Sequence, residues 1–338
     1  MRYRLTLAAA AALALAIGPA VAQPQKTYTL KLASFSPATS SIGLLFQQYE
    51  KELKAKSGGR LVLQLYNGSS MGPMPRHFDL ARTGVADIAY FQHGATPGRF
   101  PLTELIHLPY MVRDSEVGAK ILMDLQHGPL GAEEKSVHII WLSTSLPADV
   151  FHASKPIRTV ADLKGQRLRA PTTAVVGMLK SLGAIPVGVP ANLMAESLEK
   201  GTIDGIITDT NGVFSFRLGN LVKYETPLFR AALSFGLAMN LKSYAALPPD
   251  LKKLIDGIGG RGGAIRAAKS AWTENPLWVE YIKKSGVQRI SLPAGADVEM
   301  RKLAETYAQN RIAELEKKGL PARKVYAEMK ALAAKYEK

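Results

Sequence analysis

The chain has 338 residues, of which 47% are hydrophobic and none is cysteine, and its formal net charge is +15. Without cysteine the chain can form no disulfides, so a large hydrophobic core must stabilise it. Lysine and arginine are spread evenly, with no basic tail or aromatic-interleaved motif, which argues against nucleic-acid binding and favours small anionic ligands.

Residues 1–22 have the features of a secretory signal peptide. Arg2 and Arg4 precede an apolar run over 5–17, and Ala20-Val21-Ala22 offers a cleavage site after Ala22. The apolar run is shorter than the ~20 residues that span a bilayer. The sequence therefore predicts an exported, soluble periplasmic protein, and no cysteine follows the cleavage site to carry a lipid anchor.

Strands and helices alternate along the first half of the exported chain. The predicted strands are 27–33, 61–66, 88–91 and 138–142, and the predicted helices are 42–57, 76–83 and 115–125. Ser40 or Ser41 is expected to cap the first helix. This βαβα rhythm predicts a parallel sheet with helices on its faces.

A second α/β series begins near Phe151. Its predicted elements are a strand ending at Arg169, a helix at 174–182, a strand near 186–189, a helix at 192–200 and a strand at 205–208. A strand at 235–240 then returns to the first series, and the remaining helices are predicted from 251 toward 284, at 298–317 and at 322–336. The pattern predicts an α/β protein with two lobes joined by a hinge. The first lobe is expected to comprise 23–148 and 238–275, and the second 149–237 and 276–338.

Arg169 stands at the carboxyl end of a predicted strand, two residues before a proline. Ligands of open α/β sheets bind at such edges, and an arginine can hold a carboxylate through two parallel hydrogen bonds. Arg167 lies on the same strand face by the two-residue period, so spacing alone does not choose between them. The alternative interpretation, favoured by composition, is a solvated surface arginine.

The motifs that suggest enzymes are weak. Ser70 lies in a G-x-S-x-G sequence after a strand, as in a serine hydrolase, but prolines delay the following helix and the last histidine is His152. The G-x-G-x-x-G sequence at 257–262 follows a helical segment instead of a strand, so a break in a helix is the better interpretation. The histidines are scattered and the carboxylates fix no acid/base pair. We therefore predict no catalytic site, no metal site and no cofactor.

Short motifs run in a fixed order through the exported chain. They include Ser34-Phe35-Ser36-Pro37, Gly59-Arg60-Leu61, Arg82-Thr83-Gly84-Val85-Ala86-Asp87, Asp162-Leu163-Lys164-Gly165, Leu168-Arg169-Ala170-Pro171, Thr202-Ile203-Asp204-Gly205 and Leu247-Pro248-Pro249-Asp250. Together they resemble the DctP-type solute-binding proteins of TRAP transporters over nearly the whole exported chain. The resemblance implies a type II-like periplasmic binding protein fold, with mixed sheets, hinge strands and a long C-terminal helix spanning the lobes. It also implies a monomeric, non-catalytic receptor that closes over a small organic carboxylate and delivers it to the small and large subunits of an ion-driven membrane permease.

The resemblance also carries residues over. The family arginine that clamps the carboxylate corresponds to Arg169, and a second polar position corresponds to Thr208, with Asp209 beside it. Where several relatives have another arginine, this chain has Asp149, which would repel a dianionic ligand. A monocarboxylate is therefore expected, with aromatic, keto and hydroxy acids as candidates.

The remaining predicted site residues are wall residues: Phe35, Tyr90, Gln92 and Phe151. For each aromatic ring, a place in the core is the alternative. A serine hydrolase using Ser70 and a receptor of an ATP-driven transporter are the alternative functions.

Overall fold

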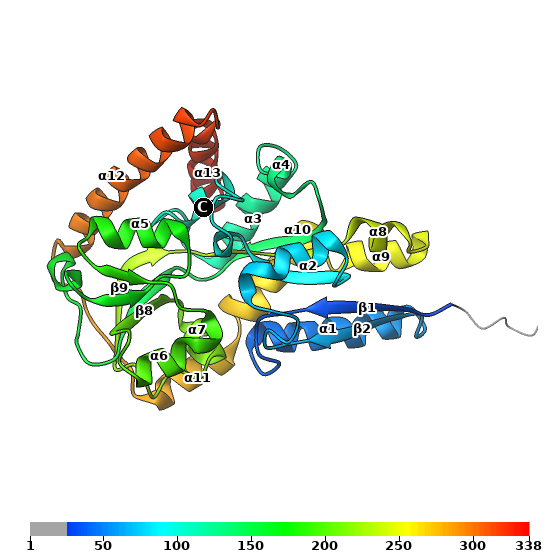
Figure 1. Cartoon of the computed structure of the whole chain (residues 1–338), viewed down its shortest axis with the longest axis horizontal. Helices are drawn as coiled ribbons and strands as arrows, with labels where there is room; N and C mark the ends of the chain where they lie inside the picture. Colours follow the sequence, from blue (N-terminus) through cyan, green and yellow to red (C-terminus); the bar gives the residue numbers. More distant parts are fainter. Residues whose placement is uncertain (1–25, 338) are drawn as a thin grey trace, which may run out of the picture.

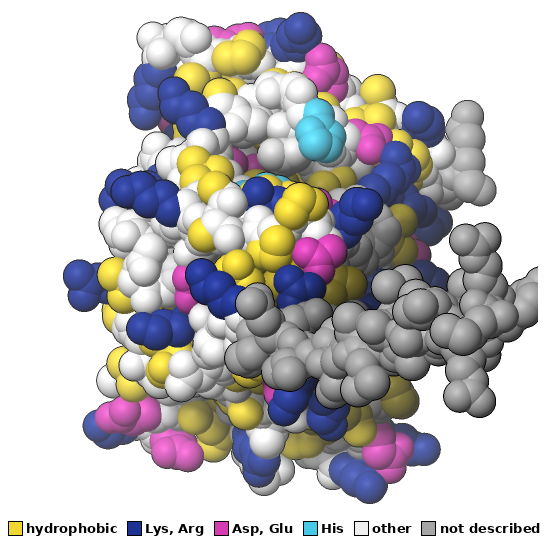
Figure 2. Space-filling model, turned by 90° about the vertical axis from the view of Figure 1, so that its right-hand side faces the viewer, with side chains coloured by type: hydrophobic (Ala, Val, Ile, Leu, Met, Phe, Trp, Pro, Cys, Tyr) yellow, Lys and Arg dark blue, Asp and Glu magenta, His cyan; other side chains and the backbone are white. Residues whose placement is uncertain are grey.

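The structure, a computed structural model, describes residues 26–337. The predicted signal peptide, residues 1–22, lies outside the described residues. Within 26–337, no helix combines the length and the apolar character needed to cross a bilayer. Figure 2 shows one face of the molecule, on which lysine and arginine side chains are scattered and do not merge into a single patch.

The described strands form two sheets, one in each lobe (Figure 1). The first sheet has the order β2-β1-β3-β10-β4, and β10 runs antiparallel to both of its neighbours. Its strands are β1 (Tyr28–Ala33), β2 (Leu61–Tyr66), β3 (Ile88–Gln92), β4 (His138–Thr144) and β10 (Ser234–Met239). The helices of this lobe are α1 (Ser41–Lys56), α2 (His77–Thr83), α3 (Ser115–Gln126), α4 (Gly131–Glu134), α8 (Leu241–Ala245), α9 (Pro249–Gly257) and α10 (Gly260–Ala268).

The second sheet has the order β11-β9-β5-β8-β6-β7. Its strands are β5 (Ala148–His152), β6 (Arg167–Arg169), β7 (Ile185–Val187), β8 (Gly205–Thr208), β9 (Tyr224–Ala231) and β11 (Gln288–Arg289). Its helices are α5 (Thr173–Ser181), α6 (Met194–Glu199), α7 (Thr210–Ser215) and α11 (Pro276–Ser285). Shorter 3-10 turns cover 74–76, 93–95, 103–107, 160–163 and 191–193.

The chain crosses between the lobes at several points. Three residues join β4 to β5, and two join β9 to β10, so each pair of strands continues from one sheet into the other. A third crossing is the π-helical turn Lys269–Thr273 between α10 and α11. At the end of the chain, α12 (Ala296–Lys317) contacts β9 and α5, whereas α13 (Ala322–Tyr336) packs on α3, so this helical pair bridges the lobes.

Most predicted elements are confirmed, and the predicted fold class is confirmed. Ser40 caps α1, because its hydroxyl accepts a hydrogen bond from Gly43 N at 3.0 Å. The helical stretch predicted after residue 250 is divided into α9, α10, the π turn and α11. The glycine motif at 257–262 lies at the junction of α9 and α10, as expected for a helix break. Strands β5, β9 and β11 and helices α4, α7 and α8 were not predicted.

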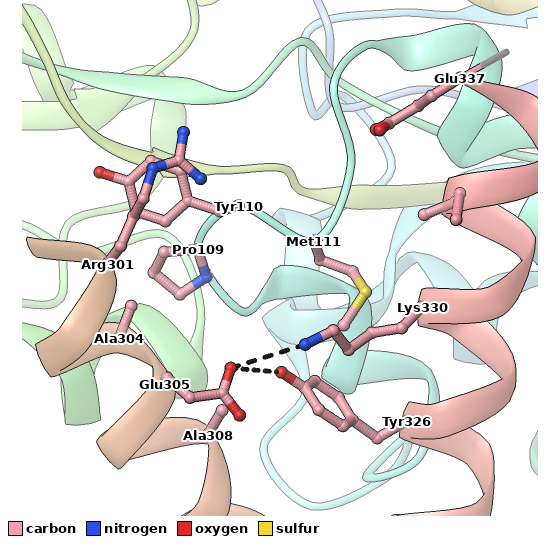
Figure 3. Close-up of a pocket in the computed structure, with 12 residues that line it drawn as sticks. Pro109, Tyr110, Met111, Arg301, Ala304, Glu305, Ala308, Tyr326, Lys330 and Glu337 are labelled. Atoms are coloured by element: carbon pink, nitrogen blue, oxygen red, sulfur yellow. Dashed lines mark hydrogen bonds and ion pairs between the residues drawn. The ribbon is translucent and has the colours of Figure 1, made fainter. Parts of the chain in front are cut away.

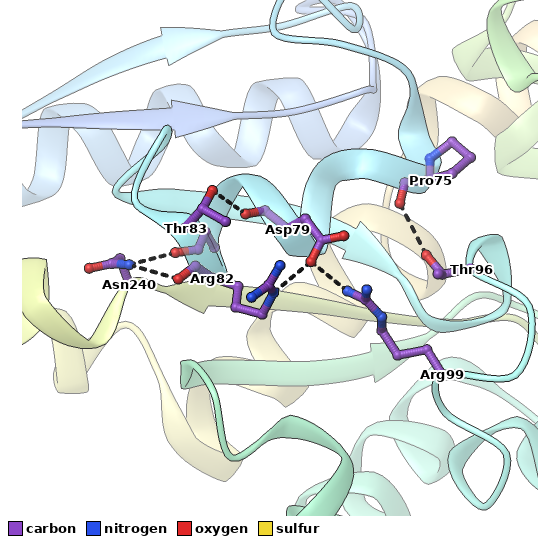
Figure 4. A network of polar contacts seen from close by, with 8 residues as sticks. Pro75, Asp79, Arg82, Thr83, Thr96, Arg99 and Asn240 are labelled. Atoms are coloured by element: carbon purple, nitrogen blue, oxygen red, sulfur yellow. Dashed lines mark hydrogen bonds and ion pairs between the residues drawn. The ribbon is translucent and has the colours of Figure 1, made fainter.

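A polar network fixes the segment that follows β3 against α2 (Figure 4). One carboxylate oxygen of Asp79 accepts hydrogen bonds from Arg82 Nε and Arg99 Nη1, both at 2.7 Å. Thr96 Oγ1 donates to the carbonyl of Pro75 at 3.0 Å. These contacts join the segment that follows β3 to α2 and to the turn before it.

Candidate functional site

A cavity of about 60 Å³ lies between the lobes. It is lined by six of the eight predicted site residues, namely Phe35, Tyr90, Gln92, Arg169, Thr208 and Asp209. The first three belong to the first lobe and the other three to the second. The structure therefore brings together side chains that lie up to 174 positions apart in the chain.

Arg169 is the only cationic residue among the described residues that line this cavity. Its side chain comes from β6, which is flanked by β7 and β8, and the residue is only 4% exposed. Its Nε donates to the carbonyl of Val189 at 3.1 Å, and no carboxylate in 26–337 lies within ion-pair distance. Burial lowers its pKa to about 10, so the guanidinium stays charged at neutral pH. A buried cation without a counter-ion is unfavourable, and an anionic ligand would supply the missing charge.

Arg167 has the opposite environment, although it lies on the same strand. It is exposed, and its Nη2 and Nε bind the two oxygens of Asp204 at 2.5 and 3.1 Å. The Asp204 carboxylate raises the pKa of Arg167. Its charge is therefore already neutralised, and the ambiguity between the two arginines is resolved in favour of Arg169 as the cavity residue.

Aromatic rings form one wall of the cavity. The rings of Phe35 and Tyr90 stack with centroids 4.8 Å apart, and Phe235 stacks on Tyr90 at 5.5 Å. Trp272, from the π turn, stacks on Phe235 at 5.6 Å. Neither Phe235 nor Trp272 was predicted as a site residue. The two-residue period of the strand predicted at 235–240 could not say which face meets the cavity, and Trp272 lies in a predicted helix without a turn signal.

Polar groups of α7 complete the second lobe's side of the cavity. Asp209 caps this helix, and its Oδ1 accepts from Gly212 N at 2.9 Å. Burial raises the pKa of Asp209 to about 6, although hydrogen bonds from backbone N–H groups lower it in part. The Thr208 hydroxyl occupies the space of a Gly212 side chain, since a Cβ there would lie 2.2 Å from its oxygen. Asn211 Oδ1 accepts a hydrogen bond from Ser41 of the first lobe at 2.7 Å.

The structure does not bring Asp149 to the cavity. Its carboxylate is buried against Arg230 Nη1 at 3.2 Å and Arg289 Nη2 at 3.6 Å, and Glu225 lies beside it. Burial raises the pKa of Asp149, and the arginines oppose that rise. The expected repulsion between Asp149 and a dianionic ligand therefore has no basis in this geometry. A preference for monocarboxylates rests instead on the single cation in the cavity lining.

Phe151 and Ser70 also lie apart from the cavity. Phe151 is fully buried in a hydrophobic cluster of the second lobe that includes Ile206 and Val213. Ser70 is exposed in the turn after β2, and no histidine or carboxylate within 26–337 hydrogen-bonds its side chain. The serine lacks the partners that would activate it as a nucleophile.

A larger cavity of about 300 Å³ lies between α12, α13 and residues 109–111 (Figure 3). Three of its charged side chains, those of Arg301, Glu305 and Lys330, already contact other side chains. The guanidinium of Arg301 lies 4.0 Å from the centroid of the Tyr110 ring. Glu305 accepts from Tyr326 Oη at 3.2 Å and lies 3.8 Å from Lys330 Nζ. No predicted site residue lines this cavity, so we assign the candidate site to the cavity that contains Arg169.

Comparison with known proteins identifies the family. The profile of the bacterial extracellular solute-binding proteins, family 7 (DctP), matches residues 32–317. A curated relative, the 2,3-diketo-L-gulonate-binding periplasmic protein YiaO of Escherichia coli K12, is 22% identical over 266 residues, which cover 78% of this chain and 81% of that protein.

Two solved structures are similar over nearly their whole length. A TRAP solute-binding protein from Rhodoferax ferrireducens T118, in complex with copurified benzoate, is 29% identical, with a TM-score of 0.87 and coverage of 92% of this chain and 99% of that one. A marine metagenome TRAP solute-binding protein specific for aromatic acid ligands, from an unidentified microbe, was co-crystallised with 3-hydroxybenzoate. It is also 29% identical, with a TM-score of 0.88 and coverage of 93% and 100%. This is a family of transport receptors and not of enzymes, and the chain belongs to it as a DctP-type solute-binding protein of the TRAP class.

Proposed function

We propose that this protein is the receptor for an aromatic monocarboxylate, which it binds between its lobes through Arg169. The observation that carries the proposal is the buried guanidinium without a carboxylate partner among residues 26–337. A carboxylate can accept two parallel hydrogen bonds from it, and exclusion of water strengthens such a pair.

The ring wall supports an aromatic ligand. Phe35, Tyr90, Phe235 and Trp272 present nearly parallel planes, with interplanar angles of 17–25° between successive stacked pairs. A flat ligand ring would extend this stack and bury its faces. The benzoate and 3-hydroxybenzoate bound by the two similar structures are ligands of this shape.

The same proposal includes the fate of the protein and its ligand. Cleavage after Ala22 would release a monomeric receptor into the periplasm, and the closed, loaded form would deliver the acid to the small and large subunits of a TRAP permease. Lobe closure would move 23–148 with 238–275 against 149–237 with 276–338.

Isothermal titration with benzoate tests the ligand class, and Arg169→Lys tests the clamp. Lysine keeps the charge but cannot form the planar paired contact, so affinity should fall at least tenfold, or about 1.4 kcal/mol. The matched control is Arg167→Lys on the same strand, which should leave affinity within twofold. Equal losses in both variants, or none in Arg169→Lys, would remove Arg169 from the site.

A further inference from the structure

We infer that the ligand carries a ring hydroxyl, which is recognised by the side-chain amide of Gln92. This inference rests on the proposed function and deepens it, because it narrows the aromatic monocarboxylates to hydroxylated ones. It assigns one polar group of the ligand to each lobe: the carboxylate to Arg169 and the hydroxyl to Gln92.

Gln92 is buried, and its amide has no hydrogen-bond partner in the described part of the chain. The residue is 4% exposed and lines the same cavity as Arg169. Its Oε1 is buried without a hydrogen-bond partner among the described residues, and no side chain or backbone group within 26–337 bonds its Nε2. A buried amide that bonds nothing costs free energy, so a polar group in the cavity is expected to meet it.

The strand geometry places this amide beside the ring wall. Gln92 is two residues after Tyr90 on β3, so both side chains point into the cavity while Phe91 packs on Phe78 and Phe100 on the other side. Gln92 is also directly paired with Phe235 of β10. The amide therefore borders the surface on which a ligand ring would lie, and Arg169 approaches from the other lobe.

The other carboxylate and amide side chains of the described lining already form hydrogen bonds. Asn211, the other amide in the lining, accepts from Ser41, and Asp209 caps α7. Gln92 alone among the carboxylate and amide side chains of the described lining lacks such a bond.

A hydroxyl is the group that fits an unpaired amide best. A glutamine amide offers an acceptor and a donor, and a hydroxyl can donate to the first or accept from the second, so either orientation of the amide is satisfied. A second carboxylate could use only the donor half, and no second cation lines the described cavity. An ammonium group could use only the acceptor half and would lie near the charge of Arg169.

The test measures a ratio of affinities by isothermal titration. Benzoate and 2-, 3- and 4-hydroxybenzoate are titrated into the wild type, into Gln92→Met and into Gln166→Met. Gln166 is the matched control, because its amide bonds His152 Nε2 at 2.9 Å and does not line the cavity. We expect at least one hydroxybenzoate to bind the wild type and Gln166→Met about tenfold more tightly than benzoate, and this ratio to fall below about threefold in Gln92→Met.

The outcomes separate this inference from the proposed function. If benzoate binds the wild type as tightly as every hydroxybenzoate, or if the preference persists in Gln92→Met, the role of Gln92 is disproved while aromatic-acid binding stands. If neither benzoate nor any of the three hydroxybenzoates binds the wild type, the proposed function fails and the inference fails with it. If Gln92→Met does not fold, Gln92→Asn, which keeps the amide but shortens its reach by one methylene, must show the same fall in the ratio.

Discussion

The hydroxyl of Thr173 donates a hydrogen bond to the buried carboxylate of Glu104, and this bond joins the two lobes. Thr173 begins α5 in the second lobe, four residues after Arg169, whereas Glu104 lies in the 3-10 turn 103–107 of the first lobe. Burial raises the pKa of Glu104, and the Thr173 hydroxyl opposes that rise. Separation of the lobes must break this bond, so it contributes to the stability of the closed state.

Thr173→Val tests this contribution, because it removes the hydroxyl and keeps the shape. Loss of one buried hydrogen bond of about 1 kcal/mol should make ligand dissociation about fivefold faster in stopped-flow displacement. Thr103→Val is the matched control, since Thr103 Oγ1 donates to Glu133 Oε2 at 2.6 Å within the first lobe. That control should lower the melting temperature without changing the dissociation rate. Equal rate changes in both variants would contradict a closing role for Thr173.

The bond between Ser41 and Asn211 is a second link between the lobes, and it involves different elements, α1 and α7. Ser41→Ala should also accelerate dissociation by about fivefold, since it leaves a buried acceptor with a weakened set of partners. Because the two links share no residue, the effects of Ser41→Ala and Thr173→Val should add in the double variant. If the ligand dissociates from the double variant no faster than from either single variant, only one of the two links forms in the bound state.

Ligand affinity should depend on pH through Asp209. Burial raises the pKa of Asp209 to about 6. The carboxyl therefore loses its proton as pH rises through 6, and the carboxylate then repels an anionic ligand in the same cavity. The other charged or titratable groups of the described lining are Arg169 and Tyr90, and neither titrates near pH 6. Between pH 5 and 7.5, where an aromatic acid with a pKa of about 4 stays ionised, affinity should therefore increase as pH falls.

Asp209→Asn isolates this effect, because asparagine keeps the helix cap but has no charge. Titrations at several pH values should give a flat affinity profile for the variant and a sloping one for the wild type. The wild type should also lose stability as pH rises from about 4 toward 6, since the folded state retains a proton that the unfolded chain has released. An equal slope in both proteins would assign the pH dependence to another group.

The sequence was sufficient for the fold class because apolar periodicity, caps and glycine stops agree along most of the chain. It was insufficient for β5 and β9, the adjacent inner strands of the second sheet. Three charged residues of these strands resemble surface residues in the sequence, namely Asp149, Glu225 and Arg230. In the structure Asp149 and Glu225 are buried and Arg230 is half-buried. The bond between Arg230 and Asp149 joins positions 81 residues apart. Pro227 also argues against a strand, yet β9 tolerates it where its pairing with β5 is irregular.

The site shows the same limit. A place for Arg169 at the edge of the sheet could be predicted, but its difference from Arg167 depends on Asp204, which neutralises Arg167 and not Arg169. The family position that placed Asp149 near the ligand gave no information on which way its side chain points. Trp272 lines the cavity because it lies in a π-helical turn, and such a turn has no recognisable local sequence signal.

Gly94 provides the strictest test of how tightly the lobes must close. A Cβ at this position, in the 3-10 turn after β3, would lie 2.4 Å from Thr172 Cγ2 and 2.5 Å from Thr172 Cβ in the other lobe. Gly94→Ala should therefore keep the lobes from closing fully around a ligand. We expect affinity for the bound acid to fall at least tenfold, because small displacements weaken every contact across the cavity.

The folded lobes should tolerate this change, since they can remain apart. Circular dichroism should show unchanged secondary structure, while small-angle scattering with saturating ligand should give a larger radius of gyration than for the liganded wild type. Gly262→Ala, on α10 with open space around its would-be Cβ, is the control and should alter neither affinity nor compaction. If Gly94→Ala binds the ligand and becomes as compact as the wild type, the close approach of Gly94 to Thr172 does not belong to the ligand-bound state. The two lobes must then be farther apart at Gly94 when the ligand is bound.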